Sequence, residues 1–123
     1  MTFLRQFLAG FRYAFDGLAY LLRTQTNARF HLLAAIAACA LGFFFGISPL
    51  EWVAIALSIG LVFAAEILNT ALEVLADRIT TDPDPQIGHA KDLAAAAVLV
   101  SAIAATVVGL VVFGPKVVGL FAG

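Results

Sequence analysis

The sequence predicts an all-α integral membrane protein, in which an N-terminal amphipathic interfacial helix is followed by three transmembrane helices. Hydrophobic residues make up 63% of the 123 residues, against about 45–50% in an ordinary soluble domain. Charged residues make up only 12%, about half the usual share. A soluble domain needs a charged surface that this composition does not supply, so we expect residues 1–123 to form a single membrane domain.

Residues 1–23 form the predicted interfacial helix. Apolar residues, many of them phenylalanines, recur in this segment at helical spacing. At about 100° per residue, its charged side chains fall within about 40° of one another. An amphipathic helix of this kind suits the boundary between lipid headgroups and hydrocarbon. The charged side chains concerned are Arg5, Arg12, Asp16 and Arg23.

Three apolar segments follow at residues 30–50, 52–76 and 93–113. At about 1.5 Å per residue, each is long enough to cross a hydrocarbon core of about 30 Å. Prolines, a glycine and acidic residues predict a loop over residues 79–89. We expect the Gly-Pro pair at 114–115 to end the third span.

The basic residues are distributed unevenly around these spans. The positive-inside rule therefore places the N-terminus and the loop at 77–92 in the cytoplasm, and the C-terminus outside. This predicts a multi-pass protein of the cell's inner (plasma) membrane whose functional site lies on the cytoplasmic side. No basic cluster is dense enough to suggest nucleic-acid binding. The basic residues on the cytoplasmic side are Arg5, Arg12, Arg23, Arg29, Arg78 and Lys91, against Lys116 on the other.

The second span carries polar residues that hydrocarbon alone does not tolerate. Glu66, Asn69 and Glu73 are spaced i, i+3, i+7 and lie on one stripe of a helix, which Asp77 extends. A lone Asn69 would be explained by hydrogen bonds between helices, worth about 1 kcal/mol each. Two carboxylates and an amide together favour a functional site, because a carboxylate in a membrane span costs several kcal/mol.

This combination of side chains suits magnesium and phosphate chemistry. Carboxylate and amide oxygens are hard ligands that fit Mg²⁺. On the same side of the membrane, Lys91 is suited to neutralising phosphate charge. For Asp92 three interpretations stay open: a metal ligand, an N-cap of the third span, or an ion-pair partner of Lys91.

The joint before the first span offers further donors and acceptors at the same membrane level, from Gln25, Asn27, Arg29 and His31. A headgroup anchor is an equal alternative for Arg29, and an ordinary interfacial residue for His31. The sequence contains no GxxxxGK[ST] or GxGxxG motif. Residue types and spacing alone therefore indicate a membrane protein with a metal or proton site near its cytoplasmic face.

The polar stripe also carries a resemblance to a known family. Residues 66–73, EILNTALE, followed by the Asp-Arg pair at 77–78, closely resemble the ExxNxxxE signature of the prokaryotic diacylglycerol kinase and undecaprenol kinase family. Residues 90–92, Ala-Lys-Asp, with Ala-Ala-Val at 96–98, resemble its second signature. The resemblance extends over nearly the whole chain. Further matches are Gly17, Asn27, Arg29 and His31.

The resemblance implies an integral membrane kinase, an ATP:lipid phosphotransferase that works as a homotrimer with active sites between subunits near the cytoplasmic interface. By position, it makes Glu66 the base that activates the lipid hydroxyl and Glu73 a ligand of Mg²⁺. It also assigns contacts with the nucleotide to a wider set. That set comprises Asn69, Glu73, Lys91, Asp92 and Arg29.

One position departs from the family pattern. Many members have a glutamate on the joint before the first span, where it joins the metal site, and this chain has Gln25. An amide oxygen can ligate a metal but brings no charge, so Gln25 is expected to be a weaker ligand. The joint TQTNARFH resembles the undecaprenol kinase branch, which favours undecaprenol over diacylglycerol as the acceptor lipid.

Two other classes of function are compatible with the polar stripe. A non-enzymatic membrane protein could use the carboxylates to line an ion or proton site. Residues 52–65 contain no ionisable side chain, however, and a path through the membrane would need more. A structural assembly module held together by polar contacts is the third possibility.

Overall fold

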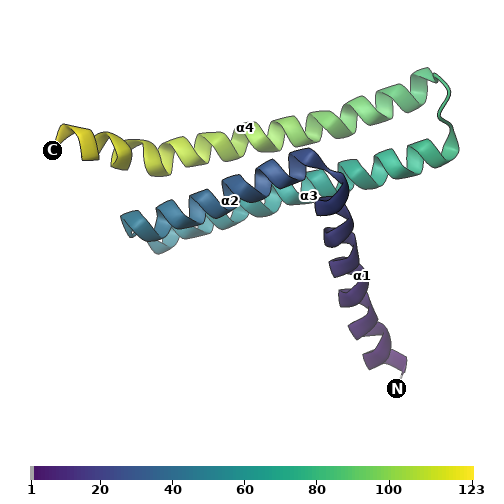
Figure 1. Cartoon of the computed structure of the whole chain (residues 1–123), viewed down its shortest axis with the longest axis horizontal. Coiled ribbons are helices and arrows are strands. Elements are labelled where there is room, and N and C mark those ends of the chain that lie inside the picture. Colours follow the sequence, from purple (N-terminus) through teal and green to yellow (C-terminus); the bar gives the residue numbers. More distant parts are fainter. Residues whose placement is uncertain (1) are drawn as a thin grey trace.

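The structure, a computed structural model, describes residues 2–123 as four helices joined by short turns (Figure 1). The helices are α1 (Thr2–Thr24), α2 (Thr26–Phe45), α3 (Pro49–Ile79) and α4 (Pro85–Ala122). α2, α3 and α4 run side by side, and each is long and apolar enough to cross a membrane. The described residues contain no strand, so the all-α prediction is confirmed.

α1 leaves the bundle across its long axis, near the start of α2 (Figure 1). Leu21 is its one buried residue, so nearly all of its apolar face is free of contact with the other helices. A helix with a strong apolar face and little packing on the bundle suits the membrane interface. The exposed large apolar side chains include Phe3, Phe7, Phe11, Tyr13 and Phe15.

The turn between α2 and α3 is built from local capping. Gly46 adopts a left-handed conformation with φ 60°, and the backbone N–H groups that follow α2 bond to the carbonyls of Gly42 and Phe43. Ser48 and Glu51 then form a reciprocal capping box at the start of α3. α2 starts at Thr26, four residues before the predicted span of 30–50. It ends at Phe45, five residues before the predicted end, because Gly46 terminates it.

The hairpin between α3 and α4 is tighter than the predicted loop over residues 79–89. Asp84 caps α4 by accepting hydrogen bonds from the N–H groups of Gln86 and Ile87, at 2.9 and 3.1 Å. Pro85 suits the first helical position because its missing N–H would have no helical partner there. The predicted loop was therefore wrong at residues 85–89, which are helical. Asp92 lies inside α4, which removes the N-cap from its open interpretations.

α4 continues through Pro115 to Ala122, so the predicted end at residues 114–115 was also wrong. A proline removes one backbone hydrogen bond, a loss that membrane helices tolerate when neighbours compensate. Lys116, the next residue, donates to the carbonyl of Val112 at 3.0 Å and to Glu51 Oε2 at 2.6 Å. This ion pair ties α4 to the start of α3.

A small apolar core lies at the same end of the bundle. Ile47, Ile55, Val112 and Phe113 are buried together, and Trp52 packs against them. The indole ring of Trp52 lies directly over Gly42, where only a glycine leaves enough room. These contacts hold the turn between α2 and α3 in place against α4.

We expect Gly42→Ala to lower the melting temperature of the detergent-solubilised protein. A Cβ atom at residue 42 would lie 2.6 Å from Cη2 of Trp52, and overpacking of this kind costs about 1–3 kcal/mol. Gly109→Ala is the matched control, because a Cβ there meets no atom within 4 Å. Equal melting temperatures for the two variants would contradict this account of the turn.

Candidate functional site

The polar stripe of α3 is the starting point of the site. Glu66 is buried, with 2% of its surface exposed, and Asn69 and Glu73 are half-buried. Asn69 Nδ2 donates to Glu73 Oε1 at 3.4 Å, so the amide and the carboxylate lie next to each other. Asn69 Oδ1 is buried and accepts no hydrogen bond from the described residues. This leaves a hard oxygen ligand free beside a carboxylate.

Glu66 meets a basic side chain from another helix. His31, in the second turn of α2, brings Nε2 to 3.2 Å from Glu66 Oε1. The histidine side chain is 26% exposed and the glutamate side chain 3%. The ring N–H does not point along the line to Oε1, so the contact is a close electrostatic approach and not an aligned hydrogen bond. The sequence suggested neither this distance nor this pairing.

The joint between α1 and α2 is held by Arg29. Its Nε donates to the carbonyl of Leu22 at 2.7 Å, and a second guanidinium nitrogen donates to the carbonyl of Arg23. These carbonyls belong to the last turn of α1, where a cation also complements the helix dipole. The structure thus gives Arg29 a task in joining two helices, and its contact with a nucleotide stays a prediction.

Gln25 stands at the N-cap position of α2, in an extended conformation. Its side-chain amide donates to Thr24 Oγ1 at 3.3 Å. Within residues 2–123, no hydrogen bond or ion pair joins Gln25 or Arg29 to the polar stripe of α3. Within the described part of one chain, His31 therefore reaches the stripe from the joint, whereas Gln25 and Arg29 do not.

Lys91 reaches the stripe from α4. Its Nζ lies 2.6 Å from Oδ1 of Asp77, the residue that extends the stripe beyond Glu73. Lys91 is therefore paired with Asp77 and not with Asp92, which removes one of the three interpretations of Asp92. Asp92 itself is exposed, and its role as a ligand stays a prediction. The spacing of the residues gave no sign of the pairing with Asp77, because 14 positions separate the two residues.

The oxygen donors of the stripe fit Mg²⁺ at one place, beside Glu73 and Asn69. Among the described residues, no three His, Cys, Asp or Glu side chains gather around one point. The oxygens that do lie together are those of Glu73 and Asn69, and Asn69 Oδ1 has no other partner. One carboxylate and one amide suit Mg²⁺, which usually keeps several waters and binds substrate phosphates as well.

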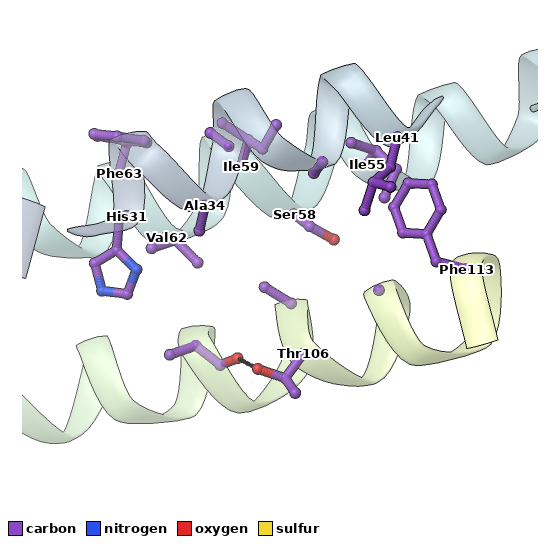
Figure 2. A pocket seen from close by; sticks show the side chains of 15 residues that line it. His31, Ala34, Leu41, Ile55, Ser58, Ile59, Val62, Phe63, Thr106 and Phe113 are labelled. Atoms are coloured by element: carbon purple, nitrogen blue, oxygen red, sulfur yellow. Dashed lines mark hydrogen bonds between the residues drawn. The ribbon is translucent and has the colours of Figure 1, made fainter. Parts of the chain in front are cut away.

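An apolar cavity of about 270 Å³ extends from His31 along the bundle to Phe113. Figure 2 shows its lining: side chains of α2 and α3 face side chains of α4 across it, and His31 stands at one end. Ser58 and Thr106 are polar, but the hydroxyl of each donates to a carbonyl of its own helix. The histidine that contacts Glu66 therefore also opens onto a space suited to hydrocarbon.

A second apolar cavity, of about 450 Å³, lies between α1 and α3. Gly17 and Tyr20 line it from α1, and Thr70 and Val74 line it from α3. The hydroxyl of Thr70 is buried without a hydrogen-bond partner in the described part of the chain. Gly17 was singled out in the sequence, and here it leaves open space on the side of α1 that faces α3.

The chain is similar to known diacylglycerol and undecaprenol kinases. The prokaryotic diacylglycerol kinase family model matches residues 12–113. The undecaprenol kinase of Bacillus subtilis (strain 168) is 42% identical over 113 residues, which cover 92% of each chain. The diacylglycerol kinase of Synechocystis is 36% identical over 92% of this chain and 65% of its own. That of Haemophilus influenzae is 35% identical over 81% of this chain and 82% of its own.

We expect Arg29→Met to loosen the end of α1. Loss of the contacts with the carbonyls of Leu22 and Arg23 removes a C-terminal cap, so amide hydrogen exchange over residues 21–25 should become about fivefold faster. Exchange is measured by mass spectrometry in detergent. Arg5→Met is the control, because Arg5 is an exposed arginine on α1, far along the chain from residues 21–25. Unchanged exchange in Arg29→Met would show that the cap contributes nothing.

Proposed function

The chain belongs to the prokaryotic diacylglycerol kinase family and is a lipid phosphotransferase, and on this premise we propose that it transfers the γ-phosphoryl group of ATP to undecaprenol. The observation that carries the proposal is the buried carboxylate of Glu66, whose neighbour His31 opens onto an apolar cavity. A base placed between polar and apolar surroundings can meet a hydroxyl whose hydrocarbon chain stays in the membrane.

Glu66 acts in this proposal as the general base. It accepts the proton of the lipid hydroxyl while the acceptor oxygen bonds to the γ-phosphorus and the bond from that phosphorus to ADP breaks. The departing ADP retains the bridging oxygen. The burial of Glu66 supports the role, because a site closed to water favours attack by the lipid hydroxyl over hydrolysis.

Glu73 and Asn69 are the residues proposed to hold Mg²⁺, with Gln25 as a further ligand. The free Oδ1 of Asn69 beside the Glu73 carboxylate supports this. When bound, Mg²⁺ supplies positive charge that neutralises the nucleotide phosphates. The amide of Gln25 adds an oxygen ligand but no charge. A glutamate at residue 25 would bring a second negative charge to the metal site.

Lys91 is the proposed partner of the nucleotide phosphates, together with Asn69, Glu73, Asp92 and Arg29. The ion pair with Asp77 supports the role of Lys91, because it fixes the ammonium group next to the polar stripe. Phosphoryl transfer depends mainly on positioning and charge neutralisation. A few side chains from three helices can therefore serve without a soluble nucleotide-binding domain.

A homotrimer with active sites between subunits is part of the proposal. Gln25 and Arg29 make no bond to the stripe of their own chain, so a neighbouring subunit could bring a second copy of the joint to it. The orientation is the one that the positive-inside rule predicts, with the site on the cytoplasmic face of the inner membrane, where ATP is available.

Diacylglycerol is the second candidate acceptor, since two of the relatives are diacylglycerol kinases. Undecaprenol is favoured because the undecaprenol kinase of Bacillus subtilis is more similar and matches along 92% of both chains. The test is a radiolabelled-phosphate assay with both lipids in competition. Undecaprenyl phosphate is the expected main product, and a large excess of phosphatidic acid would overturn the choice of acceptor.

We expect Glu66→Gln to lower kcat at least about 100-fold, because an amide cannot accept the hydroxyl proton. Glu73→Gln should raise the Mg²⁺ concentration needed for half-maximal rate about tenfold, because a charged ligand is lost. Both are measured by transfer of labelled phosphate from ATP to lipid by purified protein in detergent.

Asp82→Asn is the control for this pair and should leave turnover within about twofold, since it makes the same acid-to-amide change at an exposed side chain with no hydrogen bond or ion pair in the described residues. Normal turnover in both Glu66→Gln and Glu73→Gln would rule out the kinase proposal. Proton or cation flux into liposomes without ATP would instead support a carboxylate-lined ion site.

A further inference from the structure

Glu66 lacks the hydrogen-bond donors that a buried carboxylate normally has. Its Oε1 has almost no exposed surface and receives no aligned hydrogen bond from the described residues. A buried charge without partners is costly, so any nearby group that orients or balances it matters. Within residues 2–123, the basic side chain that forms an ion-pair contact with Glu66 is His31, at 3.2 Å.

The backbone around His31 is fixed independently of Glu66. Ala28, one turn earlier on α2, has no exposed surface and anchors that turn against its neighbours. Arg29 ties the same turn to the carbonyls of Leu22 and Arg23 in α1. In Figure 2 the imidazole projects from α2 toward α4 at the end of the apolar cavity. The ring therefore both lines the cavity and contacts the carboxylate.

We infer that His31 is a positioning residue for Glu66, an inference that rests on the proposed function. His31 Nε2, 3.2 Å from Oε1, restrains the carboxylate by this close contact, which leaves Oε2 to accept the proton of the lipid hydroxyl. The proton passes from the acceptor oxygen to Glu66, and His31 neither gains nor loses a proton in that step. Such support is needed because a base displaced by about 1 Å loses much of its effect.

A purely structural role for His31 gives different expectations. As a space-filling residue at the end of an apolar cavity, it would be replaced better by leucine than by glutamine. As a positioning residue, it would be replaced better by glutamine, whose side-chain amide keeps an N–H donor near the place of Nε2. The two substitutions therefore separate the two roles.

The experiment measures kcat and KM for lipid phosphorylation by His31→Gln and His31→Leu in detergent, with ATP, Mg²⁺ and undecaprenol. We expect His31→Leu to lower kcat about tenfold or more while both KM values change less than about twofold, since binding is untouched. His31→Gln should stay within about threefold of the unmodified protein. Leu33→Ala, an exposed position on the same turn, should leave kcat unchanged.

Two outcomes would overturn the inference. One is a kcat for His31→Leu within twofold of the unmodified protein. The other is a larger loss of kcat in His31→Gln than in His31→Leu. If the unmodified protein phosphorylated neither lipid, the proposed function would fail. A measurement that does not depend on turnover would then decide whether His31 and Glu66 interact.

That measurement is a thermal unfolding cycle of His31→Leu, Glu66→Gln and the double variant. If the two side chains interact, the two single shifts in melting temperature will not add up to the shift of the double variant. Additive shifts would overturn the pairing whatever the activity. If His31→Leu does not fold, His31→Asn replaces it in both experiments, because its amide is too short to reach Oε1.

Discussion

The intolerance of hydrocarbon for unpaired polar groups governs the rest of this structure. Inside a bilayer, every backbone N–H and carbonyl must find its partner within the chain, which leaves helices as the form that this protein can take. The same constraint favours gathering the carboxylate and amide side chains of α3 on one stripe, where Asn69 meets Glu73 and where His31 of α2 meets Glu66. The site is therefore a consequence of the solvent in which the chain folds.

Helix length decides where that site meets water. α3 has 31 residues and α4 has 38, about 46 and 57 Å at 1.5 Å per residue, whereas the hydrocarbon core is about 30 Å thick. The two helices extend past the start of α2 as a hairpin (Figure 1). Asp77 and Lys91 lie on that extension, with Glu66 nearer the apolar cavity. A lipid hydroxyl and a water-soluble phosphate can meet where the two environments join.

Short capping interactions fix the geometry between these long elements. Arg29 sets how α1 joins α2, the glycine at 46 and the capping box of Ser48 set how α2 turns into α3, and Lys116 holds α4 beyond its proline. None of these contacts touches the polar stripe. They position it by fixing the helix ends, and small errors at the ends would displace the side chains of the stripe.

The sequence by itself determined the membrane class, the number of helices and the stripe of Glu66, Asn69 and Glu73, because composition and helical spacing are local properties. It misjudged where α4 begins and ends, since a proline can start a helix or be tolerated inside one, and context chooses between these. Only the tertiary structure decided that His31 meets Glu66 and that Lys91 meets Asp77. Those pairings join different helices, and their distances depend on how the helices pack, which no spacing along one chain encodes.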